Sequence, residues 1–217
     1  LPSLLDALEG SRPGLSEIVV ADAGSEDATV EIARSRGCRT LVAPRGRASQ
    51  LNAGAAATDA GVLWFLHADT VPPPDATREI LDAVEAGAPG GAFRVAFPPE
   101  ERAAHPLLPV IERGIDVRTR ATRTATGDQG IFARRSAFDA VGGFPDWPLF
   151  EDVAFFSALR EVGRPAICPG PLRTSARRWI DEGPARTMAR MWALRLGYWA
   201  GVSPRRLAGW WRDRPAG

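Results

Sequence analysis

Short apolar runs alternate with helix-like segments through the first 90 residues, and this alternation limits the possible folds more than any other feature of the chain. The runs EIVVAD, RTLVAP and VLWFLHAD, at residues 17–22, 39–44 and 62–69, are typical of strands. The last run is apolar on both faces, as expected for a parallel sheet covered on both sides. Helical patterns follow the runs, among them residues 47–58 and 75–87. The alternation predicts an α/β domain with a mostly parallel sheet flanked by helices.

The second half of the chain is less regular. GGAFRVAF is a predicted strand and EDVAFFSALREVG a predicted amphipathic helix, at residues 90–97 and 151–163. Two further helical patterns, rich in Arg and Trp, end the chain. We therefore expect one domain over residues 1–183, with residues 184–217 as its C-terminal helical extension.

Charge and composition exclude several classes of function. The net charge is +1, so no strong positive field favours nucleic acid. No apolar run approaches the roughly 18 residues of a membrane-spanning helix. No G-x-G-x-x-G follows a strand, which argues against a Rossmann oxidoreductase. Cys38 and Cys168 lie far apart and outside any metal-ligand spacing, so we expect two free thiols in a cytoplasmic protein.

Two predicted strands end in an acid, at the edge of the sheet where α/β proteins bind ligands. Asp22 closes EIVVAD and Asp69 closes VLWFLHAD, so both carboxylates are expected along one rim. His67 and Asp69 are two residues apart and would point to the same face of a strand. An imidazole beside a carboxylate can hold Mg²⁺ or Mn²⁺. The alternative is structural, with Asp69 capping the following turn and His67 satisfied at the rim.

Six motifs occur in register between Glu17 and about Arg212. They are ADAGSEDAT, RGRASQLNAGAAA, FLHADT, GDQGIFARRSAFDAVGGF, EDVAFFSALREVG and SARRW. Together they resemble a family 2 glycosyltransferase with the GT-A fold, and most closely the bacterial subgroup that carries FLHADT, GDQG, GGFP and TSARRW. The resemblance implies that the first strand of the family's sheet precedes Leu1 and is missing from this sequence.

The resemblance implies a donor side built from the first motifs. Asp22 matches an acid that contacts the nucleotide base, although the second acid of the family's pair is Ala23 here. Arg45 or Arg47 would reach the diphosphate, and Gly46 would let the backbone approach it closely. The alternative for both arginines is solvated surface.

The resemblance also implies a metal site. The family's motif is Asp-x-Asp, and the chain keeps only the final acid in His67-Ala68-Asp69. Asp69 is therefore the predicted ligand of Mg²⁺ or Mn²⁺, shared with the donor diphosphate. His67 is either a second ligand or a neighbour of the first.

The remaining motifs imply the catalytic and acceptor side. Asp152 corresponds to the family's general base, and Glu151 would orient the acceptor or the base. Two acids at a helix N-terminus are also explained by the helix dipole alone. Further predicted donor or acceptor contacts are Asp128 and Gln129 of GDQG, and Arg177, Arg178 and Trp179 of SARRW, where Ser175 replaces the family's Gln.

The resemblance combines these expectations into one activity. The chain is similar to non-processive, inverting, metal-dependent hexosyltransferases that use a nucleotide sugar, with UDP favoured over GDP. The terminal helices either pack as a cap or rest on the inner face of a membrane near a lipid-linked acceptor. Two alternatives stay open, a sugar-phosphate nucleotidyltransferase and a non-catalytic nucleotide-sugar-binding module. A nucleotide-sugar hydrolysis assay would separate an enzyme from the binding module.

Overall fold

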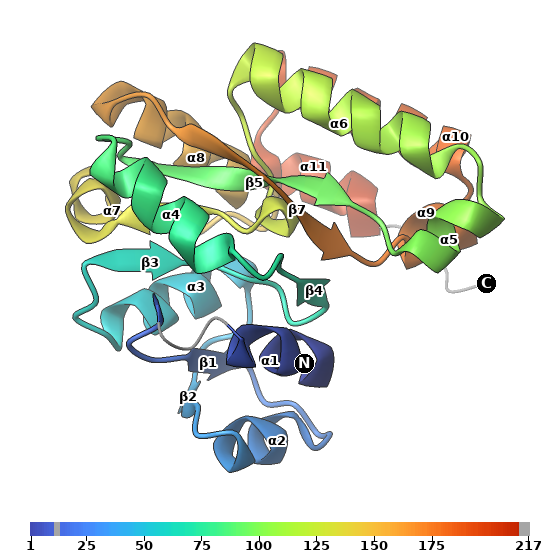
Figure 1. Cartoon of the computed structure of the whole chain (residues 1–217). Helices are drawn as coiled ribbons and strands as arrows, with labels where there is room; N and C mark the ends of the chain where they lie inside the picture. The colour runs from blue at the N-terminus through green and yellow to red at the C-terminus, as the bar shows by residue number, and fades with distance from the viewer. Residues whose placement is uncertain (11–13, 213–217) are drawn as a thin grey trace.

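The computed structural model describes residues 1–10 and 14–212, whose strands form two sheets (Figure 1). The strands are β1 (Val19–Asp22), β2 (Arg39–Val42), β3 (Val62–Trp64), β4 (Thr70–Val71), β5 (Gly90–Ala96), β6 (Phe132–Arg134) and β7 (Ala166–Thr174). The helices are α1 (Pro2–Glu9), α2 (Thr29–Ser35), α3 (Arg47–Ala56), α4 (Ala76–Glu85), α5 (Pro99–Ala104), α6 (Leu108–Thr122), the 3-10 turn η2 (Gly127–Gln129), α7 (Arg135–Val141), α8 (Glu151–Val162), α9 (Arg177–Glu182), α10 (Pro184–Trp199) and α11 (Pro204–Arg212).

The larger sheet runs in the order β3-β6-β5-β7-β4 and is mixed. β5 pairs with β7 in parallel, whereas the β3–β6, β5–β6 and β4–β7 pairs are antiparallel. The predicted α/β class and flanking helices are confirmed, but the sheet is not mostly parallel. The alternation that suggested a parallel sheet covers only the first half of the chain. β6 and β7 come from the irregular half, and β4 crosses to the opposite edge of the sheet from β3.

β1 and β2 form a separate two-stranded parallel sheet. Among the described residues, no strand pairing joins it to the larger sheet, and α3 connects the two parts instead. α3 packs against both β1 and α8, and the Gln50 side-chain amide donates to the Ala21 carbonyl at 2.9 Å. These residues do not test the strand predicted before Leu1, which stays a prediction.

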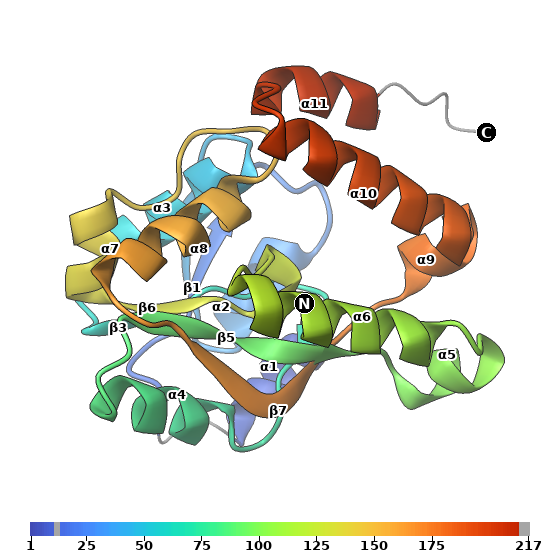
Figure 2. The ribbon, with the colours of Figure 1, turned by 90° about the horizontal axis from the view of Figure 1, so that it is seen from above.

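Helices cover both faces of the larger sheet (Figure 2). One face carries α3, α7 and α8 over a phenylalanine cluster in which Phe144 and Phe155 stack with ring centres 4.2 Å apart. On the other face, α4 buries Ile80 against Phe93 and Phe132. This packing fixes the strands, and therefore the loops that leave their ends.

A third apolar cluster ties the C-terminal helices to the rest of the molecule. Phe97 and Ile111 are buried there, and Trp179 and Met188 pack against them from α9 and α10. The predicted helical extension is therefore present, while the division at residue 183 stays a prediction. Among the described residues, none of the helices combines the length and apolarity that crossing a bilayer requires.

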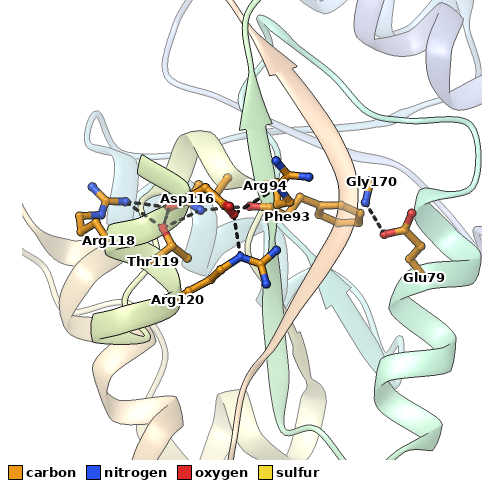
Figure 3. Close-up of polar contacts among 9 residues, drawn as sticks. Glu79, Phe93, Arg94, Asp116, Arg118, Thr119, Arg120 and Gly170 are labelled. Atoms are coloured by element: carbon orange, nitrogen blue, oxygen red, sulfur yellow. Dashed lines mark hydrogen bonds and ion pairs between the residues drawn. The ribbon is translucent and has the colours of Figure 1, made fainter. Parts of the chain in front are cut away.

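Strand β7 was missed in the sequence because two prolines interrupt its pattern. Cys168 faces Phe93 across the β5–β7 pair, but the next partner of β5 is Pro171, so the chain bulges at Pro169 and Gly170. The amide of Gly170 turns away from the ladder and donates to Glu79 Oε2 at 3.0 Å (Figure 3). The bulge gives Pro169 a place where no ladder hydrogen bond is required.

Candidate active site

The metal motif lies in a tight turn between β3 and β4. The Thr70 amide and hydroxyl donate to the His67 carbonyl at 3.1 and 2.6 Å. His67 and Asp69 are therefore turn residues, and the expectation that they share the face of a strand is wrong, because β3 ends at Trp64. The Asp69 side chain is exposed and has no hydrogen bond or ion pair to a described residue, so its carboxylate does not cap the turn.

Three segments distant in sequence meet at Gly127, the first residue of η2. Its amide donates to Asp152 Oδ2 at 2.7 Å. A Cβ atom at this position would lie 2.8 Å from His67 Nε2 and 3.5 Å from Asp152 Oδ2, so a side chain here would require the His67 imidazole to move. The predicted histidine of the metal motif and the predicted base thus face one point.

The N-terminus of α8 presents two acids in different surroundings. Asp152 is 9% exposed, and its Oδ1 accepts the amide of Val153 at 2.7 Å. Glu151 is only 2% exposed and forms an ion pair with Arg47 Nε at 2.6 Å. Burial, together with the charge of Asp152, raises the pKa of Glu151, although Arg47 opposes the shift. Arg47, predicted at the diphosphate, therefore links α3 to α8.

Asp22 is held by the loop that follows it. Its carboxylate accepts bonds from the Ser25 hydroxyl at 2.5 Å and from the amides of Ser25 and Gly24 at 2.9 and 2.8 Å. The Ser25 hydroxyl, followed by these amides, lowers the pKa of Asp22. Its hydrogen bonds shape the loop after β1, and the predicted contact to a nucleotide base stays a prediction.

A hollow of about 600 Å³ lies at the N-terminus of α3. Arg45, Gly46 and Arg47 line one side, and the loop of residues 146–148 and Arg205 of α11 line the other. Arginines beside the amides of a helix N-terminus attract anions. The hollow therefore suits the predicted role of Arg45 at a diphosphate, and it adds Arg205, which the sequence did not single out.

The two polar residues of η2 have separate environments. Gln129 is 1% exposed, donates to the Phe93 carbonyl at 3.0 Å and accepts from the Thr126 amide at 3.1 Å. Its side-chain amide therefore stabilises the loop from inside the protein, and a sugar could reach it only if the loop rearranged. Asp128 Oδ1 is buried and has no hydrogen-bond partner among the described residues. Of the two, Asp128 has the free polar atom.

The SARRW motif spans the start of α9. Arg177 and Arg178 are exposed on α9, and Trp179 packs edge-on against Phe97 with ring centres 6.4 Å apart. Trp179 also lines a narrow cleft of about 100 Å³ between α6, α9 and α10. The cleft gives Trp179 a place beside a ligand, whereas contacts of Arg177 and Arg178 with donor or acceptor stay predictions.

The sequence did not point to three further residues near the site. They are Arg118 of α6, and Arg195 and Tyr198 of α10. Both arginines line the cleft of Trp179, and the charge of Asp152 acts on all three side chains. Burial and the Asp152 charge raise the pKa of Tyr198. The only signal in the sequence was an arginine inside the otherwise apolar stretch MWALRLGYW.

The described residues contain no group of three or more His, Cys, Asp or Glu side chains able to hold a metal ion. Asp69 instead offers one free, exposed carboxylate next to His67. Mg²⁺ is commonly bound by one or two carboxylates together with substrate phosphates and water. The residues present fit a cation shared with a phosphate ligand.

Fold and site together define an α/β protein of the GT-A type, with an acid-bearing turn and a helix N-terminus converging beyond the sheet. The family model of glycosyl transferase family 2 matches residues 1–142. The chain therefore belongs to glycosyl transferase family 2, which confirms the class of enzyme predicted from the motifs. No curated protein sequence matches the chain.

Solved structures share the fold at low sequence identity. A mannosyltransferase from Pyrobaculum calidifontis, in complex with GDP-Man and Mn²⁺, is 20% identical with a TM-score of 0.55, over 81% of this chain and 53% of that one. A glucosyl-3-phosphoglycerate synthase from Mycobacterium tuberculosis, in complex with Mn²⁺ and UDP-Glc, is 18% identical with a TM-score of 0.53, over 79% and 65%. The chain thus spans between about half and two thirds of these relatives.

Proposed function

We propose that the chain is a non-processive, inverting glycosyltransferase that moves a sugar from a nucleotide-diphosphate donor to an acceptor hydroxyl, assisted by Mg²⁺ or Mn²⁺. The observation that carries the proposal is the convergence of Asp152 and His67 at Gly127, within a family 2 fold. UDP-sugars are the favoured donors, in keeping with the UDP-Glc complex of one structural relative.

Asp152 is the proposed general base. Its carboxylate removes the proton of the acceptor hydroxyl while the acceptor oxygen bonds to the anomeric carbon and the bond from that carbon to the diphosphate breaks. A single displacement from the face opposite the diphosphate inverts the anomeric centre. The amides of Gly127 and Val153 orient the carboxylate, which supports this role because a base must be held within reach of the proton it takes.

The donor side is proposed at the rim formed by Asp69 and the hollow beside α3. Asp69 would hold the cation, with His67 as a second ligand or as a neighbour of a coordinating water. When bound, the cation would offset the negative charge that builds on the leaving diphosphate. Arg45 and Arg205 support phosphate binding in the hollow, and Asp22 is retained as the proposed contact to the base.

Substitution of Asp152 tests the proposal. Asp152→Asn keeps the size and one of the two backbone hydrogen bonds, from Gly127 or from Val153, but cannot take a proton, so transfer should fall by roughly 10²–10⁴-fold. Donor affinity should stay near that of the wild type. The measurement is donor binding by calorimetry and transfer rate in the same preparation, with the anomeric configuration of the product read by NMR.

Glu151→Gln is the matched control, because it lies next to Asp152 but is tied to Arg47. We expect a smaller loss of turnover than in Asp152→Asn. Near-normal turnover in Asp152→Asn with a severe loss in Glu151→Gln would transfer the role of base to Glu151. Retention of configuration would rule out the single displacement, and a lack of any donor binding would rule out the transferase.

The C-terminal helices support a peripheral contact with the cytoplasmic face of a membrane. Trp192, Leu196 and Trp199 follow one another at helical spacing on α10 and are 47%, 57% and 55% exposed. Arg205 and Arg206 are exposed at the start of α11. Exposed Trp and Leu on one helix, followed by exposed arginines on the next, suit an interface with anionic lipid, so we propose a lipid-linked acceptor as one class to test.

A further inference from the structure

Arg195 is a mostly buried arginine that makes no direct bond to the described part of the chain. It extends from α10, is 7% exposed, and has no hydrogen bond or ion pair to any residue in the described part of the chain. Burying most of a charged side chain is costly unless the charge is paired. A ligand with the opposite charge would supply that pair.

Arg118 lies beside Arg195 and is only partly satisfied. Its Nη2 donates to Gln129 Oε1 at 3.0 Å and to Thr119 Oγ1 at 3.3 Å, as part of the group of contacts on α6 in Figure 3. Its Nε is buried without a partner. Burial, and after it the charge of Arg195, lower the pKa of Arg118 to about 10, so its guanidinium group stays charged at neutral pH. Arginine side chains in proteins keep their charge in general.

The two arginines share an otherwise apolar cleft of about 100 Å³ between α6, α9 and α10, which has room for several water molecules or a small anionic group. Its apolar walls are formed by Ile111, Ile115, Trp179, Met188, Met191 and Trp192. An anion that entered this cleft would exchange its contacts with water for contacts with two guanidinium groups, in surroundings of low polarity. Charge-assisted hydrogen bonds are strong in such places.

The charge of the proposed base acts on both arginines of the cleft. The charges of Asp128 and Asp152 act on both Arg118 and Arg195, yet neither arginine forms an ion pair with them within 4.0 Å in the described residues. Asp128 Oδ1 is buried and unpartnered as well. Arg118 Nε and Asp128 Oδ1 thus each remain available to bond with a ligand.

We propose that the acceptor carries a phosphate or carboxylate group, which binds Arg118 and Arg195 and thereby places the acceptor hydroxyl at Asp152. This inference rests on the proposed transferase function and assigns the chemical class of its acceptor. Asp128 would accept a hydrogen bond from a second hydroxyl of the same molecule. The competing explanation is that the arginines only balance the two acids.

Anion binding by the free protein tests the inference without any turnover. The probes are glycerol 3-phosphate and glycerate against neutral glycerol, with thermal stabilisation and calorimetry as readouts at constant ionic strength. We expect stabilisation by at least one of the two anions and none by glycerol. Stronger binding of one anion distinguishes a phosphate from a carboxylate acceptor. Hexyl phosphate in place of glycerol 3-phosphate shows whether the apolar walls favour an amphipathic acceptor.

Substitutions on α10 locate the binding. Arg195→Gln should weaken binding of the anion about 10-fold or more, as expected for loss of a charge-assisted bond. Arg195→Lys keeps a charge without the planar fork and should retain part of the affinity. Arg186→Gln removes an exposed arginine of the same helix and should change nothing. If Arg195→Gln does not fold, Arg195→Lys and the wild-type titration still decide.

Several outcomes would overturn the inference. Equal effects of glycerol and the anions would do so, and so would full anion affinity in Arg195→Gln. Binding of UDP-Glc or GDP-Man with Mn²⁺ is measured in the same variants to keep the two hypotheses apart. Loss of donor binding in Arg195→Gln would assign the arginines to the donor while the transferase survives. A wild type that binds the anion but no donor would instead end the transferase proposal.

Discussion

At the scale of single residues, His67 and Asp69 in the turn after β3 differ in burial and in contacts. The imidazole of His67 is partly buried, with Nε2 directed at Gly127, whereas Asp69 is exposed and free of partners within the described residues. The Asp69 carboxylate can turn toward a cation without breaking a bond to a described residue, whereas the His67 side chain is confined by its neighbours. We therefore expect Asp69 to carry most of the metal dependence.

Asp69→Asn should remove the Mn²⁺-dependent part of donor binding and leave the fold intact, because the side chain supports no other residue. Donor affinity with and without Mn²⁺, together with the melting temperature, is the measurement. His67→Ala should weaken the Mn²⁺ effect modestly. An unchanged Mn²⁺ effect in Asp69→Asn would contradict the assignment of Asp69 as the metal ligand. A loss in His67→Ala as large as that in Asp69→Asn would identify His67 as a direct ligand.

Residues of the site differ in how far the sequence could predict them. Asp69, Asp152 and Glu151 lie in motifs, so the sequence could single them out, and their roles stay predictions. Arg195 could not be found in this way, because a single arginine in an apolar helix is usually at the surface. Its burial depends on the packing of α10 against α6, which involves residues far apart in sequence.

At the scale of elements, β5 is the strand on which the larger sheet depends. It pairs with both β6 and β7, and the backbones come close at its first two residues. A Cβ atom on Gly91 would lie 2.4 Å from the Ala166 carbonyl oxygen and 2.6 Å from the Phe132 ring. The absence of a side chain there lets β6 and β7 flank β5.

Gly91→Ala should therefore destabilise the protein by about 1–3 kcal/mol, the usual cost of forcing a methyl group into a packed core. Chemical denaturation is the measurement. Gly61→Ala is the matched control, since a Cβ atom on Gly61 meets nothing within 4 Å. Equal stabilities of the two variants would contradict the close packing of β5.

Elements were predictable where local pattern decides them. α4 and α8 have clear amphipathic or apolar spacing and occur close to where the sequence predicts them. β7 and β4 were not recognised, because one carries two prolines at a bulge and the other has two residues only. Their pairing is decided by the tertiary structure, and with it the mixed direction of the sheet.

At the scale of the whole molecule, α10 connects two proposed surfaces. The charge of Asp152 acts on Arg195 and Tyr198, whereas Leu196 and Trp199 remain exposed, as does Trp192 at the edge of the Arg195 cleft. The rings of Trp192 and Trp199 lie 6.4 Å apart, so they form one patch. A protein resting on lipid through this patch would bring the Arg195 cleft close to an acceptor anchored in the same membrane.

The patch predicts binding to vesicles rich in phosphatidylglycerol, and weaker binding to phosphatidylcholine vesicles, because Arg205 and Arg206 add attraction to anionic lipid. Replacing Trp192, Leu196 and Trp199 together by serine should reduce partitioning by at least about 100-fold, since each buried apolar side chain contributes roughly 1.5–3 kcal/mol. Vesicle sedimentation measures the effect. Val42→Ser is the control, because Val42 is 86% exposed on β2, away from α10 (Figure 1). Equal partitioning of the triple variant and the wild type would show that the patch does not bind lipid and would leave packing as the role of the C-terminal helices.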